Sequence, residues 1–154
     1  MEPRYQIRRA APADAAAIAH HRRSMFSDMG LTDHLDAMEA SFAAYAAEQI
    51  AQGAYLGWLV IDPEGGIVGG AGVQMFEWGA VPRVPHTHLR PYIMNVYVEP
   101  AHRRAGLARA LLQAIIDWAR AEGYGSITLH ASEFGRPLYE QLGFTATNEM
   151  RLAL

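Results

Sequence analysis

The chain has 154 residues, 51% of them hydrophobic, which predicts a single globular domain spanning residues 1–154 with a sizeable core. Its net charge of −3 argues against an overall basic surface, so we expect neither nucleic acid nor a membrane as a partner. The absence of cysteine excludes disulfides, zinc–thiolate sites and a cysteine nucleophile.

The start of the sequence is charged and lacks the apolar core of a signal peptide. No apolar run reaches the ~18 residues that a membrane helix needs. We therefore expect a cytoplasmic protein.

The first third of the sequence predicts one strand and two helices. Residues 4–10 alternate loosely and predict the strand. Pro12 suits the first turn of a helix, which should run toward Gly30, and Thr32 or Asp33 can cap a second helix that ends at Gly53. The expected apolar positions are Ile18, Met25, Phe26 and Met29 in the first helix, and a buried stripe of Leu35, Met38, Phe42 and Tyr45 in the second.

Two strands follow, at residues 55–61 and 67–78. The turn sequence Asp-Pro-Glu-Gly-Gly at residues 62–66 predicts that they form an antiparallel hairpin. Gly69, Gly70 and Gly72 weaken the second strand, and they indicate a bulge or the close approach of another backbone.

Residues 79–88 contain two prolines and predict an irregular loop, which suits a substrate lid beside a central strand. His86 and His88 are spaced like metal ligands on a strand. No carboxylate or third histidine nearby completes a site, so we expect no metal.

The second half predicts a strand at residues 92–98, a helix from Leu107 to Gly123, a strand at 126–130, a short helix at 133–142 and a closing strand at 148–154. The helix has an apolar stripe of Leu107, Leu111, Ile115 and Trp118. The order β-α-α-β-β-β-α-β-α-β predicts an α/β (α+β) domain, a mixed sheet with helices on both faces.

The start of the helix at Leu107 has the features of an anion site. Unpaired N–H groups and the helix dipole make such an end positive. Gly106 and Ala108 leave it open to a ligand, and Arg103, Arg104 and Arg109 add charge. These features favour a phosphate or a pyrophosphate. The Gly-x-Gly-x-x-Gly spacing of dinucleotide-binding loops is absent, and a chain without lysine cannot form an ATP-binding P-loop.

Two motifs carry a resemblance to a known family. Residues 103–108 read Arg-x-x-Gly-x-Ala after a Val-x-Pro strand end, and residues 138–144 read Leu-Tyr-Glu-Gln-Leu-Gly-Phe. The first resembles the acetyl-CoA signature of the GNAT superfamily of N-acetyltransferases, and the second resembles the last motif of that fold. The resemblance covers nearly the whole chain.

The resemblance implies a mostly antiparallel sheet whose central strands splay apart, with acetyl-CoA in the gap and no metal. Pantetheine would pair with the backbone of Val96, Tyr97 and Val98, and Tyr139 would point at the sulfur. Ser132 stands where the family often has Asn and can still hydrogen-bond pantetheine, and Gly135 stands where it often has Ala. The pyrophosphate would bind Arg103, Arg104, Ala105, Gly106, Leu107, Ala108 and Arg109.

The chemistry needs a base for the amine, an oxyanion donor and a proton for the leaving thiolate. The backbone N–H groups of residues 96–98 suit the oxyanion, and the Tyr139 phenol suits the thiolate. The base and the acceptor contacts stay open among Phe26, Glu77, Asn95 as a water holder, His130 and Glu133. The polar cluster at residues 20–23 is either a solvated face or in part a contact for the acceptor.

We therefore expect an enzyme that moves an acetyl group from acetyl-CoA directly to an amine of a small molecule or peptide in a ternary complex. The acceptor would enter between the first helix, the 79–88 loop and the final hairpin. The alternatives are a non-catalytic acyl-CoA-binding sensor and a different nucleotide-binding α/β domain. A homodimer is compatible with the resemblance, with residues 148–154 as a contributing edge.

Overall fold

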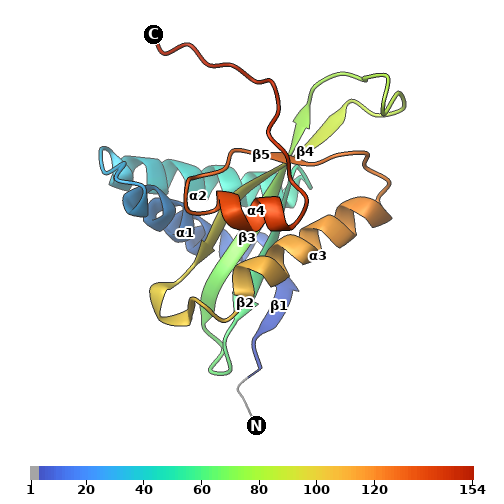
Figure 1. Ribbon diagram of the computed structural model, residues 1–154. Coiled ribbons are helices and arrows are strands. Elements are labelled where there is room, and N and C mark those ends of the chain that lie inside the picture. The colour runs from blue at the N-terminus through green and yellow to red at the C-terminus, as the bar shows by residue number, and fades with distance from the viewer. Residues whose placement is uncertain (1–3) are drawn as a thin grey trace.

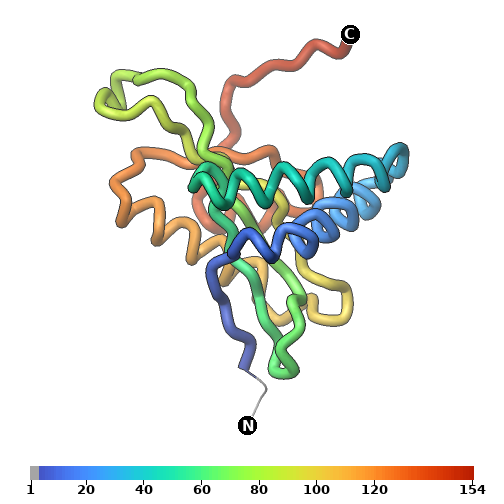
Figure 2. The backbone as a smooth tube through the Cα atoms, turned by 180° about the vertical axis from the view of Figure 1, so that it is seen from behind, coloured from blue at the N-terminus to red at the C-terminus, as the bar shows by residue number. Residues whose placement is uncertain are grey.

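An open five-stranded sheet lies between two pairs of helices in the computed structural model, which describes residues 4–154. Helices α1 (Ala15–Asp28) and α2 (Leu35–Ala51) cover one face, and α3 (Leu107–Ala121) and α4 (Arg136–Gln141) cover the other (Figures 1 and 2). Short 3-10 turns at Pro12–Asp14 and Pro100–His102 precede α1 and the loop that enters α3. This arrangement confirms the expected fold class.

The strands follow one another in chain order across the sheet: β1 (Gln6–Arg9), β2 (Tyr55–Ile61), β3 (Ile67–Glu77), β4 (Leu89–Val98) and β5 (Thr128–Leu129). The first four are antiparallel, and the expected hairpin of β2 and β3 is confirmed. Only β5 is parallel to its neighbour, and it pairs with β4 at Tyr92 and Ile93 alone. Beyond this pair, β4 has no strand on its β5 side among residues 4–154, so the sheet opens there.

The larger core lies between the sheet and α3. The expected stripe of α3 is buried at Leu107, Leu111 and Ile115. Trp118 is half-buried and meets the ring of Trp58 edge-on, with 5.6 Å between centroids. On the opposite face, the stripe expected for α2 is wrong at Tyr45, which is 43% exposed, because α2 buries the small side chain of Ala46 instead.

A bulge in β4 changes which residues face each core. Asn95 has a left-handed φ of 58°, and the register of β3 against β4 shifts between Gly70 and Gly72. Ile93 and Val96 therefore both pack on the α3 side, although they are three residues apart. The sequence prediction of a bulge or a close approach in the glycine-rich part of β3 is confirmed.

The expected closing strand at residues 148–154 is wrong. Residues 144–154 have no regular structure, and Figure 1 shows this end of the chain leading away from the sheet. Met150, Leu152 and Leu154 alternate with other residues as in a strand, but they are 93%, 81% and 114% exposed because no neighbouring strand pairs with them. The final hairpin expected from this segment is therefore absent from the described residues, whereas its part in a homodimer stays a prediction.

Two other elements are shorter than expected, and one helix cap differs. The strand expected at residues 126–130 keeps only Thr128 and Leu129, and the helix expected from Glu133 begins at Arg136. The cap of α2 is His34, in a left-handed conformation, rather than Thr32 or Asp33. Among the described helices, none is long and apolar enough to cross a membrane.

Candidate active site

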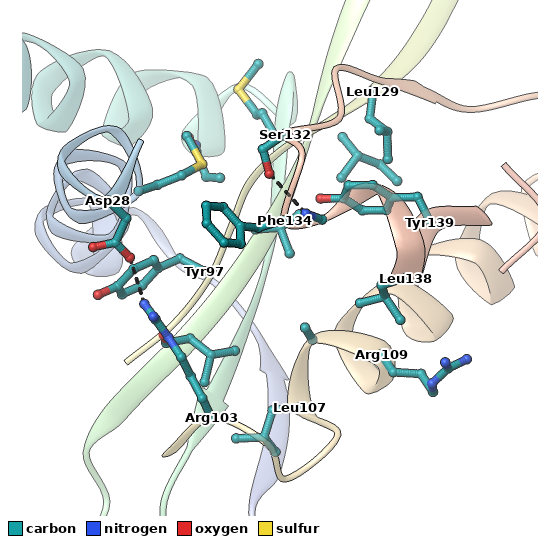
Figure 3. Close-up of a pocket in the computed structure, with 18 of the residues that line it drawn as sticks. Asp28, Tyr97, Arg103, Leu107, Arg109, Leu129, Ser132, Phe134, Leu138 and Tyr139 are labelled. Carbon is teal, nitrogen blue, oxygen red and sulfur yellow. Dashed lines mark hydrogen bonds and ion pairs between the residues drawn. The ribbon is translucent and has the colours of Figure 1, made fainter. Parts of the chain in front are cut away.

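The opening of the sheet forms one wall of a cavity of about 1130 Å³. Side chains from α1, β4, the start of α3, the segment after β5 and α4 line it (Figure 3). The site residues predicted from the sequence that line it are Phe26, Asn95, Val96, Tyr97, Val98, Arg103, Arg104, Gly106, Leu107, Ala108, Arg109, His130, Ser132 and Tyr139.

The start of α3 is open toward this cavity. Gly106 is the N-cap with a φ of 75°, and no side chain caps the helix. The N–H groups of the first turn of any helix have no acceptor within the helix, and here no side chain accepts their hydrogen bonds either. The helix dipole adds partial positive charge at this end. Arg104 and Gly106 are exposed, so a ligand can reach these amides. The arrangement is that of an anion site.

The three arginines near this helix end have different surroundings. Arg103 donates from Nε to the carbonyl oxygen of Val98 at 2.8 Å and from Nη2 to Asp28 at 2.8 Å, so it fastens the loop to β4 and α1 (Figure 3). The hydrogen bond that Arg103 donates to the Asp28 carboxylate raises the pKa of Arg103. Arg109 donates to Gln141 of α4. Because Gln141 is neutral, Arg109 keeps its charge, and Arg104 has no side-chain partner among residues 4–154, so the charges of Arg104 and Arg109 are both available to a ligand.

Tyr139 projects from α4 on the opposite side of the cavity, beside Ser132 (Figure 3). Burial raises the pKa of the Tyr139 phenol, so the hydroxyl keeps its proton at neutral pH. Gly135 makes room for this ring, because a Cβ there would lie 2.8 Å from Cε2 of Tyr139. Ser132 Oγ accepts a 3.1 Å hydrogen bond from the Gly135 backbone, which begins α4. The Ser132 hydroxyl still has its own proton to donate.

A sequence model described as the acetyltransferase (GNAT) family matches residues 16–144. The chain belongs to the GNAT family. Among solved structures, a GCN5-related N-acetyltransferase from Ralstonia eutropha JMP134 is 32% identical with a TM-score of 0.90, and the match covers 98% of this chain and 99% of that one. A protein from Clostridium acetobutylicum, solved with acetyl-CoA and described as a predicted acetyltransferase, is 24% identical with a TM-score of 0.88, over 98% and 96% of the two chains. At that identity the second likeness shows the fold alone.

Curated relatives match over shorter segments. Glucosamine 6-phosphate N-acetyltransferase of Trypanosoma brucei brucei is 41% identical over 64 residues, which are 41% of this chain and 44% of that protein. N-acetyltransferase 8 of Homo sapiens is 30% identical over 63 residues, which are 39% of this chain and 28% of that protein. The chain spans less than half the length of these curated relatives. The family match excludes the alternative of a different nucleotide-binding α/β domain.

Within the GNAT domain, the residues predicted for the acceptor side separate into two groups. Phe26 and His130 line the cavity, whereas Glu77 lies outside it, paired in register with Leu89 near the far end of the β3–β4 hairpin. Glu133 is exposed and also does not line the cavity. Of the residues predicted to bind the pyrophosphate, Ala105 alone does not line it. Because neither glutamate lines the cavity, we do not propose either of them as the base.

Asn95 lines the cavity, but its side chain is a structural link. It is buried, its Nδ2 donates to Tyr55 Oη at 3.0 Å, and its Oδ1 accepts from Arg22 Nη1 at 2.8 Å. Each end of the amide has one protein partner and can make one more hydrogen bond, so the role of water holder stays a prediction.

His130 belongs to a chain of three polar groups that the sequence did not reveal. Its Nδ1 bonds to Tyr92 Oη, and its Nε2 lies 2.9 Å from Glu149 Oε1. Tyr92 also lines the cavity. The spacing of 38 residues between Tyr92 and His130 carries no local signal, and only the parallel pairing of β4 with β5 brings the two together.

The loop at residues 79–88 does not cover the cavity, so its expected role as a lid is wrong. Trp78, Val81 and Val84 line a separate small pocket with residues 124–126 instead. His88 Nδ1 accepts a 3.0 Å hydrogen bond from Ala80 and so holds the loop's own shape. Among residues 4–154, no three acidic or histidine side chains come together as a metal site.

Proposed function

We propose that this GNAT protein is an acetyl-CoA-dependent N-acetyltransferase that transfers the acetyl group directly to an amine in a ternary complex. The observation that carries the proposal is the uncapped start of α3, which opens into the large cavity beside the unpartnered Arg104. A sensor that only binds acyl-CoA would use the same helix end. Tyr139, in the same cavity with its proton retained at neutral pH, favours the enzyme.

The residues that line the cavity fit coenzyme A. The first-turn amides at Leu107, Ala108 and Arg109 would hold the diphosphate, with Arg104 as counter-charge. The β4 edge at residues 96–98 lines the cavity where β5 has ended, and its backbone would pair with the pantetheine amides. When bound, acetyl-CoA supplies an acetyl group activated as a thioester.

Tyr139 would act as the general acid. Its Oη would give a proton to the thiolate that leaves as the carbon–sulfur bond breaks. The raised pKa of Tyr139 keeps this proton in place over the neutral and moderately alkaline range. The N–H groups of β4 at residues 96–98 would stabilise the negative charge that develops on the carbonyl oxygen.

His130 would act as the base, since it is the one titratable side chain among the base candidates from the sequence that lines the cavity. It would take the proton of the acceptor ammonium, through Tyr92 Oη or directly, before the new nitrogen–carbon bond forms. Glu149, bonded to Nε2, would orient the ring and stabilise the imidazolium that results.

The acceptor in this proposal is an amine of a small molecule or a peptide. The named relatives support this class, because one acts on glucosamine 6-phosphate and the others are called N-acetyltransferases. The test is a panel of amines with acetyl-CoA, in which release of free thiol is followed and acetyl-CoA binding is measured by calorimetry. Binding with amine-dependent thiol release supports the transferase, whereas binding without release from any amine would favour the sensor.

A further inference from the structure

Arg22 of α1 is a cation in the cavity wall without a carboxylate partner among residues 4–154. Its Nη1 donates a 2.8 Å hydrogen bond to the neutral amide oxygen of Asn95. Its Nε is buried and has no hydrogen-bond partner. Because a guanidinium has five N–H donors, the described contacts use only one of them.

The guanidinium of Arg22 is held in a fixed place by aromatic rings. Its Cζ lies 4.9 Å from the ring centroid of Phe26 and 4.5 Å from that of Phe42, which comes from α2. Two rings that pack on the flat group limit its movement. The group is therefore fixed beside the cavity before any ligand arrives.

The neighbouring arginine on the same helix has the opposite surroundings. Arg23 bonds to Asp36 and, at 3.1 Å, to Glu39, and it does not line the cavity. The ionisable groups that act on Arg22 are three phenols, those of Tyr55, Tyr92 and Tyr45, and burial lowers its pKa. Burying a cation with no anionic partner costs free energy, and a bound anion would recover part of it.

Arg22 also lies apart from the proposed diphosphate site. Asp28, six residues further along α1, is the residue that contacts Arg103 in the loop before α3. Six residues of helix span about 9 Å. Arg22 is next to Asn95 and close to Tyr92, which bonds to His130, so it belongs to the acceptor side of the cavity.

We propose that Arg22 binds an anionic group of the acceptor, so that the substrate is an amine that also carries a carboxylate or a phosphate monoester. This inference rests on the proposed function. A carboxylate and a phosphate can each accept two parallel N–H bonds from a guanidinium. Either group would bind the N–H donors of Arg22 that are not used in its hydrogen bond to Asn95.

The test compares acceptors that differ only in the anionic group. One pair is glucosamine 6-phosphate and glucosamine, and the other is 4-aminobutyrate and 4-aminobutyramide. We expect kcat/KM, measured by thiol release at saturating acetyl-CoA, to favour the anionic member of at least one pair roughly 10- to 100-fold, as for a charge-assisted hydrogen bond. The pair that shows the preference tells phosphate from carboxylate.

Three variants separate recognition from structure. Arg22→Gln should bring the ratio within a pair close to one, Arg22→Lys should keep part of it, and the matched control Arg23→Gln should leave it unchanged. Loss of the Arg22–Asn95 hydrogen bond would lower the activity toward both members of a pair alike, so the ratio reports the ligand contact alone. A ratio near one in the wild type, or one that Arg22→Gln does not change, overturns the proposal.

Failure of the transferase proposal gives a different result. If acetyl-CoA binds but no amine in the panel causes thiol release, the enzyme proposal fails, and the Arg22 inference is then decided by calorimetric titration of the same pairs onto the protein saturated with coenzyme A. Tighter binding of the anionic member, lost in Arg22→Gln, supports an anion site. Equal binding of both members, or binding of neither, overturns it.

Discussion

Tyr55 Oη occupies the space that a side chain at residue 72 would need. A Cβ on Gly72 would lie 1.8 Å from that oxygen. From this position, Tyr55 on β2 reaches across β3 and accepts a hydrogen bond from Asn95 at the bulge of β4. The hydrogen bond between Tyr55 and Asn95 therefore links the centre of the sheet to β4, the strand that forms the cavity wall.

Gly72→Ala should destabilise the protein by about 3 kcal/mol, because the methyl group displaces a buried tyrosine and its hydrogen bond to Asn95. The free energy of unfolding in urea measures the loss. Gly125→Ala is the control, since its nearest neighbour would be 3.5 Å away, and it should change stability by less than about 0.5 kcal/mol. Equal losses in the two variants would contradict this account of Gly72.

Tyr139→Phe should lower kcat by about 100-fold or more and leave acetyl-CoA affinity near normal, because it removes only the proton donor. The same phenol predicts the alkaline side of the pH profile. Since burial raises the pKa of Tyr139 above its usual 10, activity should not fall through loss of this proton until the pH exceeds about 10. Tyr124→Phe, outside the cavity, is the control. Unchanged turnover in Tyr139→Phe would remove the acid role from this residue.

His21 should make the fold sensitive to acid. It is 2% exposed, it packs on the Tyr97 ring, and burial lowers its pKa to about 4. The unfolded chain, with a histidine pKa of about 6.5, takes up the proton first, so this stability is present above pH 6.5 and is lost as the pH falls toward 4. The shift corresponds to about 3 kcal/mol.

Urea unfolding at a series of pH values from 7 to 4 measures this effect. His21→Gln should flatten the decline in stability between pH 6.5 and 4, and His86→Gln, in an exposed loop, should leave it as in the wild type. The explanation fails for His21 if its variant shows the same slope as the wild type.

Much of the fold could be predicted because its signals are local. The turn at residues 62–66, the apolar stripe of α3 and the start of α3 after Val-x-Pro each depend on neighbouring residues, and the structure has them where expected. The prediction of a closing strand at residues 148–154 is wrong because it uses only a local signal, the alternation of apolar residues. A strand also needs a neighbouring strand to pair with, and this segment has none among the described residues.

The acceptor side was less predictable because long-range contacts build it. Arg22 lies in a polar cluster of four residues, and only the packing of α1 on β4 and α2 separates it from Arg23. The bulge at Asn95 reverses the alternation of β4, so the side on which each residue lies could not be read from its spacing. Glu77, chosen for its place near a strand end, lies near the far end of a hairpin away from the cavity.

The start of α3 is the feature on which the proposed function depends most, and Gly106→Asp tests it. Aspartate tolerates the left-handed conformation of residue 106, and its carboxylate would accept the hydrogen bonds of the first-turn amides and repel a diphosphate. Gly123→Asp places the same charge and a similar backbone conformation at the other end of the helix.

The decisive measurement is the calorimetric Kd of acetyl-CoA for the wild type and these two variants. We predict binding by the wild type, a Kd at least about tenfold higher in Gly106→Asp, and less than a twofold change in Gly123→Asp. Wild-type affinity in a folded Gly106→Asp protein would contradict the claim that this helix end holds coenzyme A.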